Sequence, residues 1–203
     1  MIYVGLLRHG VVEGNEVYRG RSDDPLSAIG RVQMWDAMVG LNHWDRIISS
    51  PLQRCADFAT EFAHYHSIPL SLEPDLAEID FGEWEGRSAA ELMQVSPEAL
   101  TDYWRDPRNH TPPGGESLLE FRHRVVEAWE ALRRSHDGQR LLLVSHGGVI
   151  RVLLCHLQGW SLDRILEIEV KHAALFGFQV TQQSTKRLFT SRVSMEAWLK
   201  GES

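Results

Sequence analysis

The sequence predicts an α/β fold: a three-layer α/β/α sandwich with a mostly parallel central sheet. Two observations carry this prediction. Short apolar runs alternate with helical patterns along most of the 203 residues, which is the order found in βαβ units. Two of the runs, at residues 2–7 and 141–144, each end in a polar residue followed by His-Gly. Ligands in open α/β sheets bind at the carboxyl ends of the strands, so we expect both histidines at one site.

The first half of the chain contains three predicted strands separated by helices. Residues 2–7 are continuously apolar, as in a buried strand. Residues 45–49 contain a central pair of isoleucines, and residues 70–72 are a short apolar run that follows a proline. Between these runs, residues 27–41 and 52–66 have helical patterns. The alternation predicts two consecutive strand–helix–strand units.

In the second half, residues 118–134 carry the most strongly patterned helix. Apolar residues recur there at three- and four-residue steps, as one buried face requires. Ser117 and Glu120 have the spacing of a capping box at its start. The elements that follow are a strand at 141–144, a helix at 148–157 and two late strands at 174–180 and 186–192.

The length fits a single domain over residues 1–203. Residues 87–116 differ from the rest because they concentrate prolines and glycines around two short helical patterns. We expect this stretch to be a small helical lid-like insertion. Trp104 and Arg105 within it are expected to line the substrate entrance.

Composition narrows the function classes. The net charge of −7 disfavours a nucleic-acid-binding protein, although a local cluster of arginines can still attract a small anion. Cys55 and Cys155 lack the number and spacing of a disulfide framework or a metal site, so we expect buried free thiols. The first apolar run ends in Arg8 and is too short for a signal peptide or a membrane span. We therefore expect a cytoplasmic protein without membrane or nucleic-acid partners.

The trio Arg8-His9-Gly10 combines three groups suited to a small anion. The guanidinium offers a planar fork for phosphate or carboxylate oxygens, a neutral imidazole can act as a nucleophile, and glycine lets the backbone approach a ligand closely. Alone, the trio also fits a charged surface turn. His146 precedes two glycines that open a helix, and helix N-termini bind anions. Alone, His146 also fits a core histidine with satisfied hydrogen bonds.

Two further segments supply groups that such a site needs. Arg54 lies in the first turn of a predicted helix, where a cation is unfavourable unless something compensates. A bound anion would do so, and a local carboxylate such as Asp57 is the alternative. Residues 76–86 interleave four carboxylates with aromatic residues and glycines. A carboxyl group near aromatic walls can hold its proton to near neutral pH and act as a general acid, whereas most of these four fit a solvated turn.

Together these segments resemble the histidine phosphatase superfamily, in the branch shared with cofactor-dependent phosphoglycerate mutases. The matching residues follow the family's order over residues 7–148: Leu7-Arg8-His9-Gly10, Asn15, Gly20 to Gly30, Ser49-Ser50-Pro51-Leu52 with Arg54, Leu76, Glu78, Phe81-Gly82, Trp84-Glu85-Gly86 and Ser145-His146-Gly147-Gly148. Among subfamilies, residues 113–117 and 146–151 resemble α-ribazole phosphatases of cobalamin synthesis and also less specific phosphatases of the same shape.

The resemblance implies a phosphomonoesterase that works through a phosphohistidine intermediate. His9 would be the nucleophile, and Glu78 the general acid and later the base that activates water. The residues implied to hold the phosphoryl group are Arg8, Asn15, Arg54, His146 and Gly147. Substrate contacts are implied at Gly20 and Arg21. No metal or other cofactor is implied, because the arginines and the histidine neutralise the charge that Mg²⁺ neutralises in other phosphoryl-transfer enzymes.

The substrate implied is a small phosphorylated metabolite, with inorganic phosphate as a product. α-Ribazole 5'-phosphate, phosphoglycerates and nucleotide or sugar phosphates stay open, because leaving-group recognition is spread over the insertion. The oligomeric state is not encoded in these motifs.

Three alternative functions fit the sequence less well. A phosphoglycerate mutase-type phosphoryl transferase is disfavoured by the short chain, and a non-catalytic phosphate-binding module by the presence of both nucleophile and acid. A serine hydrolase would need a Gly-x-Ser-x-Gly elbow, which is absent. At Val11-Val12 the chain departs from the family, which usually has an acid followed by Ser or Thr. The other histidines, including His172, show no ligand spacing, and we expect them to lie outside the site.

Overall fold

The structure is a computed structural model, and it describes residues 1–181 and 184–189. Within these ranges six strands form one sheet in the order β3-β2-β4-β1-β5-β6. They are β1 (Ile2–Arg8), β2 (Arg46–Ser49), β3 (Leu70–Leu72), β4 (Arg140–Ser145), β5 (Leu175–Val180) and β6 (Thr185–Phe189). The first four are parallel, whereas β5 and β6 pair antiparallel. The predicted mostly parallel sheet is confirmed; residues 190–192 of the predicted last strand lie outside the described residues.

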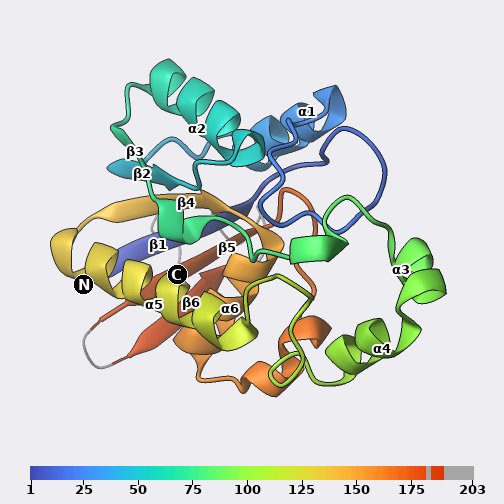
Figure 1. The fold of residues 1–203 in the computed structure, drawn as a ribbon. Helices are drawn as coiled ribbons and strands as arrows, with labels where there is room; N and C mark the ends of the chain where they lie inside the picture. Colours follow the sequence, from blue (N-terminus) through green and yellow to red (C-terminus); the bar gives the residue numbers. More distant parts are fainter. Residues whose placement is uncertain (182–183, 190–203) are drawn as a thin grey trace.

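Helices cover both faces of the sheet (Figure 1). One face carries α1 (Ala28–Ala37) and α2 (Gln53–His66), and the other carries α5 (Leu118–Ser135) and α6 (Gly147–Gln158). In β4, Leu141 and Leu143 pack into the core beneath α5 and α6, while Leu142 and Val144 pack beneath α1 and α2. Burial on both faces explains why this strand is apolar throughout. The predicted three-layer sandwich is confirmed.

Local signals set the helix boundaries. Ser27 and Ser117 are N-caps whose side chains accept a backbone N–H of the first turn, and the capping box of Ser117 with Glu120 is confirmed. The helix predicted over residues 27–41 ends at Ala37, before a turn in which Gly40 adopts a φ of 77°. A left-handed backbone of this kind favours glycine and ends a helix.

Residues 87–116 contain two short helices, α3 (Ala89–Val95) and α4 (Pro97–Arg105), which lie beside the sandwich at the right of Figure 1. They share a small core with the preceding turn, formed by Trp84, Leu92, Leu100 and Tyr103. Periodicity did not predict three 3₁₀ helices, at Pro74–Leu76, Gly82–Trp84 and Leu162–Glu167. These segments are too short to show a period.

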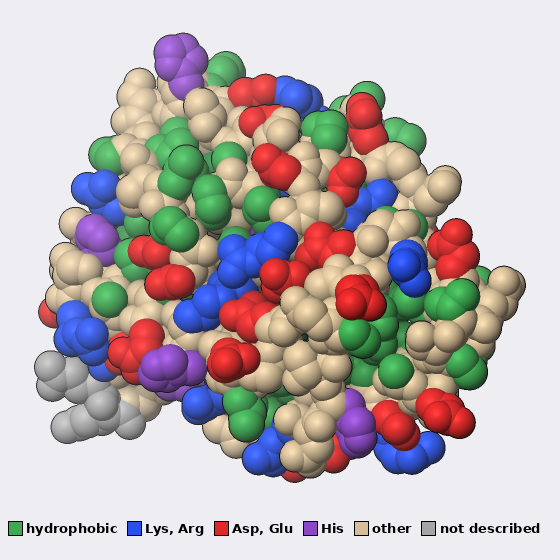
Figure 2. Space-filling model, viewed as in Figure 1, with side chains coloured by type: hydrophobic (Ala, Val, Ile, Leu, Met, Phe, Trp, Pro, Cys, Tyr) green, Lys and Arg blue, Asp and Glu red, His purple; other side chains and the backbone are tan. Residues whose placement is uncertain are grey.

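The surface carries charged side chains of both signs. In Figure 2, acidic and basic side chains are interspersed over the face in view. Among the described residues no helix has both the length and the apolar character needed to cross a bilayer.

Strand register brings the two His-Gly segments together. β1 and β4 are parallel neighbours with Arg8 opposite Ser145, so His9 and His146 occupy the next positions along the two strands. Ser50 follows β2 and is tied to the same edge, because its N–H donates to the carbonyl of Val144 at 3.0 Å. Three segments that are distant in the sequence therefore end side by side.

Candidate active site

His9 lies directly after β1 and is 6% exposed. Its Nδ1 lies 2.8 Å from the carbonyl oxygen of Gly10. Because a carbonyl only accepts hydrogen bonds, Nδ1 carries the ring proton and Nε2 keeps its lone pair. Burial, and then the positive charge of Arg8, holds the pKa of His9 well below the usual imidazole value. His9 is therefore a neutral imidazole with a free Nε2, the form that a nucleophile requires.

The guanidinium of Arg8 lies against the start of α6. Its Nη1 donates to the carbonyl of Val170 at 2.6 Å, and its Nη2 is 3.1 Å from Nε2 of His172. Its Nε is buried without a partner. A Cβ built on Gly147 would lie 3.4 Å from that Nε. Arg8 thus holds a positive charge and a free donor beside the helix N-terminus, where anions bind.

His146 is the N-cap residue of α6 and is completely buried. Nε of Arg54 donates to its Nδ1 at 3.2 Å, and its Nε2 lies 2.7 Å from Oγ of Ser50. Since Nδ1 accepts, the ring proton is on Nε2 and is donated to Ser50. Burial, and then the charge of Arg54, keeps the pKa of His146 well below its usual value. The rings of His9 and His146 are 5.3 Å apart, edge to face, so two neutral imidazoles adjoin.

Arg54 lies in the first turn of α2 and is 1% exposed. Besides its bond to His146, it donates from Nη1 to the carbonyl of Ser22 at 2.5 Å and from Nη2 to that of Gly20 at 2.7 Å. No ion pair joins it to Asp57 or to any other carboxylate of the described residues. Two carbonyls and a neutral imidazole hold this buried cation, and no carboxylate in the described part of the chain pairs with it.

Glu78 is 8% exposed and faces the beginning of α6. Its Oε2 accepts the N–H of Gly148 at 2.9 Å, and its Oε1 accepts that of Ile79 at 3.0 Å. A Cβ on Gly148 would lie 2.3 Å from Oε1 of Glu78, so any other residue here would push the carboxyl group out of this position. The backbone thus holds Glu78 at the same end of α6 that carries His146.

Other acids of residues 76–86 support the loop structure. Glu85 accepts the backbone N–H groups of Arg21 and Ser22, each at 2.6 Å, and that of Phe81 at 3.2 Å. Asp80 accepts the N–H of Gly82 at 2.8 Å. Glu85 therefore fastens the loop after β1 to this segment, which places the carbonyls that hold Arg54.

Some predicted residues lie apart from this cluster. The side chains of Asn15 and Arg21 are exposed on the loop after β1, and Gly20 contributes its carbonyl to Arg54. Trp104 is 45% exposed, and its Nε1 donates to the hydroxyl of Tyr18 at 2.9 Å.

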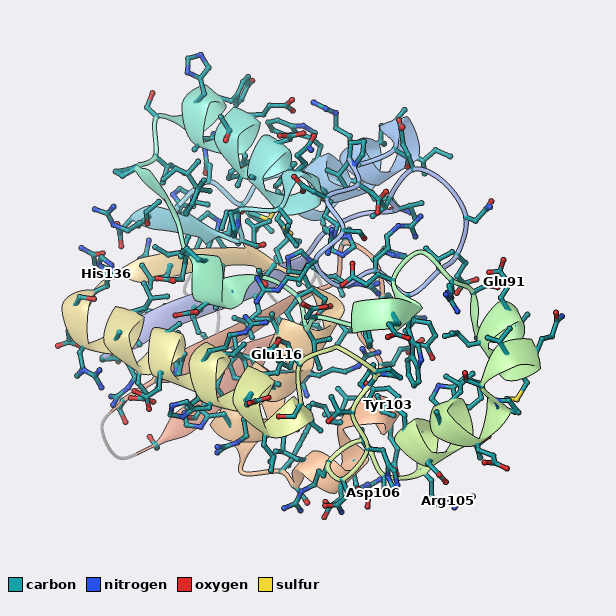
Figure 3. All side chains as sticks on the ribbon, viewed as in Figure 1. Glu91, Tyr103, Arg105, Asp106, Glu116 and His136 are labelled. Atoms are coloured by element: carbon teal, nitrogen blue, oxygen red, sulfur yellow. The ribbon has the colours of Figure 1, made fainter. Side chains whose placement is uncertain are left out.

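Arg105 lies on the outer side of α4, whereas Tyr103 faces inward (Figure 3). The Arg105 side chain is 73% exposed and pairs with Asp102 at 3.3 Å. The structure thus brings together Arg8, His9, Arg54, Glu78, His146 and Gly147, and it places Asn15, Arg21, Trp104 and Arg105 around the periphery.

Two residues that the sequence did not predict also lie at the cluster. The ring centre of His172 is 5.8 Å from that of His9. Arg151 donates from Nε to the carbonyl of Ile168 at 2.8 Å, and its Nη1 lies 3.5 Å from a Cβ built on Gly147. Arg151 could have been found, because it is four residues after Gly147 on one helix face. The loop that places His172 leaves no spacing signal.

The arrangement offers a small oxyanion several hydrogen-bond donors and two positive charges that no carboxylate of the described residues pairs with. Arg8 and Arg54 bring two positive charges to the N-terminus of α6, and neither has a carboxylate partner among the described residues. Within the same residues, no group of three or more His, Cys, Asp or Glu side chains is arranged to hold a metal ion. A tetrahedral anion beside a neutral imidazole nucleophile fits this geometry.

Comparison with known proteins identifies the family. The profile of the histidine phosphatase superfamily (branch 1) matches residues 4–189. The chain belongs to this superfamily. Phosphoserine phosphatase 1 of Hydrogenobacter thermophilus is 33% identical over 168 residues, which is 81% of this chain and 80% of that protein.

Two further proteins extend the comparison. A bifunctional protein of Mycobacterium tuberculosis is 37% identical over 154 residues, or 73% of this chain, but the matched region is only 42% of that longer protein. The crystal structure of the alpha-ribazole phosphatase from Shigella flexneri superposes with a TM-score of 0.84 at 26% identity, covering 93% of this chain and 96% of that one. The superfamily expected from the motifs is confirmed.

Proposed function

We propose that this chain is a phosphomonoesterase that hydrolyses a small phosphorylated metabolite of the cytoplasm through a phosphohistidine at His9. The observation that carries the proposal is the neutral, buried His9, whose Nδ1–H is held by Gly10 and whose Nε2 is free beside Arg8. Membership of the histidine phosphatase superfamily supports the same chemistry.

In the first step, the lone pair of His9 Nε2 forms a bond to phosphorus as the ester P–O bond breaks. Glu78 gives its proton to the departing alkoxide oxygen. Arg8 and Arg54 balance the negative charge on the other phosphoryl oxygens, assisted by the N–H groups that begin with Gly147, while His146 accepts the Nε–H of Arg54 and so holds that guanidinium in place. Positioning and charge neutralisation dominate catalysis of phosphoryl transfer.

In the second step, the Glu78 carboxylate takes a proton from a water molecule as the water oxygen attacks phosphorus. The P–N bond breaks, inorganic phosphate leaves, and His9 returns to its neutral form. The hydrogen bonds that Glu78 accepts from Ile79 and Gly148 support this double role, because they hold the carboxyl group in one place for both proton transfers.

The leading candidate for the substrate is α-ribazole 5'-phosphate. The Shigella flexneri protein with this fold is described as an alpha-ribazole phosphatase, and the half-exposed indole of Trp104 offers an aromatic surface for a heteroaromatic base. We propose that residues 87–116 form a lid and that Trp104 is its contact with the substrate, because Arg105 lies on the outer side of α4 and pairs with Asp102.

The second candidate is O-phosphoserine. The Hydrogenobacter thermophilus relative is named a phosphoserine phosphatase. Arg151 favours a leaving group with a carboxylate, because only its Nε has a hydrogen-bond partner and no ion pair with it is found among the described residues.

The decisive test is His9→Ala with p-nitrophenyl phosphate. We expect turnover to fall by more than about 10⁴-fold, because the covalent step is lost. The wild-type protein mixed rapidly with labelled substrate is expected to retain acid-labile label that His9→Ala lacks. Exposed His43, changed to alanine, serves as the matched control. Activity that survives in His9→Ala contradicts the proposal.

The same assay with α-ribazole 5'-phosphate, O-phosphoserine and 3-phosphoglycerate ranks the leaving groups by kcat/KM. Isomerised phosphoglycerate in place of free phosphate would identify a mutase instead.

A further inference from the structure

The loop before β5 reaches back to the candidate nucleophile. Residues 170–174 form a short segment, here called the Arg8 clamp, between the last 3₁₀ helix and β5. The N–H of Arg8 donates to the carbonyl of Ala174 at 3.0 Å, and the N–H of Ala173 donates to the carbonyl of His9 at 3.2 Å. The clamp is thus fixed to both of these residues through the backbone.

The clamp also holds the side chain of Arg8. Its Nη1 donates to the carbonyl of Val170, and its Nη2 lies 3.1 Å from Nε2 of His172. Because a guanidinium only donates, His172 must accept with Nε2 and carry its ring proton on Nδ1. These two contacts leave the buried Nε–H of Arg8 without a partner. The contacts therefore decide which edge of the guanidinium stays available.

The backbone of the clamp is strained where it presents His172. Ala173 has a φ of 56°, a left-handed conformation that costs a non-glycine residue about 1 kcal/mol or more. Such conformations persist where the surrounding contacts fix them. Here the hydrogen bonds of Ala173 to His9 and of Ala174 to Arg8 provide those contacts.

The charged groups around His172 come from two elements. Arg8 lies on β1, and Glu16 and Arg19 lie on the loop that follows it. His9, directly after β1, is the other titratable group there, with its ring centre 5.8 Å from that of His172. The surrounding protein atoms, and then Arg8, lower the pKa of His172, while Glu16 opposes them. A neutral ring is therefore the state that faces Arg8 at neutral pH.

We propose that His172 is a positioning residue: as a neutral acceptor it holds Arg8 so that the free Nε–H edge meets the phosphoryl group, and on protonation it releases Arg8. This rests on the proposed function, since Arg8 must bind a phosphoryl group for its orientation to matter.

The test compares three substitutions. His172→Gln keeps an acceptor, His172→Leu has none, and His172→Lys imitates the protonated ring. We expect His172→Leu and His172→Lys to lower kcat/KM for p-nitrophenyl phosphate by about 10- to 100-fold, the effect of one hydrogen bond to a charged group. His172→Gln should stay within about threefold of the wild-type protein at pH 7.5. His43→Gln is the control for an exposed histidine.

The pH dependence separates positioning from a structural role. Because the pKa of His172 is lowered, the wild-type protein should lose Arg8 positioning only at pH values below the ordinary imidazole pKa of about 6.5, whereas His172→Gln cannot be protonated there. The ratio of kcat/KM for His172→Gln to wild type should therefore be flat above pH 7 and rise towards pH 5. A flat ratio throughout, or Gln as impaired as Leu, overturns the proposal.

Phosphate binding gives a measurement that does not depend on turnover. In the His9→Ala background, calorimetry with inorganic phosphate should show about tenfold weaker binding for His172→Leu than for His172→Gln. Equal binding by the two variants overturns the role of His172. No phosphate binding by either the wild-type protein or His9→Ala would instead contradict the proposed function itself.

Discussion

Arg54 is 1% exposed and the Arg124 side chain 15% exposed, and these two arginines have different partners. Arg124, on α5, forms a bidentate pair with Glu116 at 2.6 and 2.8 Å and also donates to the carbonyls of Asp75, Ala77 and Glu78. Glu116 lies just before α5 (Figure 3). Arg54 binds two carbonyls and an imidazole but no carboxylate of the described residues.

The difference separates structural from functional charge. A guanidinium that meets a carboxylate is neutralised and fixes the chain around it. A guanidinium that is hydrogen-bonded only to neutral groups keeps its positive charge uncancelled, and that charge can attract an incoming anion. Arg124 donates to the backbone carbonyl of Glu78 and so helps to position the acid. Arg54 keeps its charge available for the substrate.

Replacing Arg54 with Met tests the functional half of this comparison. We expect kcat/KM for p-nitrophenyl phosphate to fall by about 10³- to 10⁵-fold, the effect of an arginine that neutralises a phosphoryl transition state. Far-ultraviolet circular dichroism checks that the variant is folded. Nearly normal activity would show that this buried cation serves packing alone.

Changing Glu78 to Gln tests the acid that Arg124 helps to place. The amide keeps the shape but donates no proton to the leaving oxygen, so kcat/KM should fall by about 10²- to 10⁴-fold. The loss should be smaller for p-nitrophenyl phosphate, whose leaving group needs little protonation, than for an alkyl phosphate. A negligible loss with both substrates would move the role to Asp80 or Glu83.

Replacing Arg124 with Met tests the structural half. It removes the cation that pairs with Glu116 and the donor to three carbonyls, and we expect the free energy of unfolding to fall by about 3 kcal/mol in urea titrations. Arg133→Met is the control, because Arg133 pairs with Glu130 one turn away on the same helix and is more exposed; there we expect about 0.5 kcal/mol. Equal losses would remove the distinction.

The smallest expected effect is that of His9 on how the free energy of unfolding changes with pH. The pKa of His9 is depressed in the folded protein, so below about pH 6.5 the unfolded chain binds a proton that the folded protein does not. This destabilisation is absent above that pH and grows as the pH falls. His9→Gln should therefore lose less unfolding free energy than wild type, by up to about 1.4 kcal/mol per pH unit between pH 6 and 5. Parallel curves for the two proteins would indicate that His9 is charged when folded.

The sequence predicted the sheet, its helices and the core of the site because each rests on a local signal. Continuous apolar runs predicted β1 and β4, and a capping box predicted the start of α5. Arg8, His9 and His146 were found because strand ends and helix starts mark where ligands bind.

What was missed depends on long-range pairing. The antiparallel pairing of β5 with β1 brings the Arg8 clamp to the site. No motif spacing in the sequence predicts this pairing. The carbonyls of Gly20 and Ser22 that hold Arg54 were also not predicted, because backbone groups carry no residue signal. Sequence reasoning found the side chains that carry the chemistry and not all the groups that orient them.

The position of β1 has a consequence for how the protein is made. In the described sheet β1, residues 2–8, has only β4 and β5 as neighbours, and these begin at residues 140 and 175. Such non-local pairing slows folding. During synthesis β1 leaves the ribosome long before β4 or β5 has been made, so its apolar side chains and unpaired backbone groups stay available for non-native contacts. His9 and His146 come together only when β1 pairs with β4, so the appearance of activity during refolding should coincide with completion of the sheet.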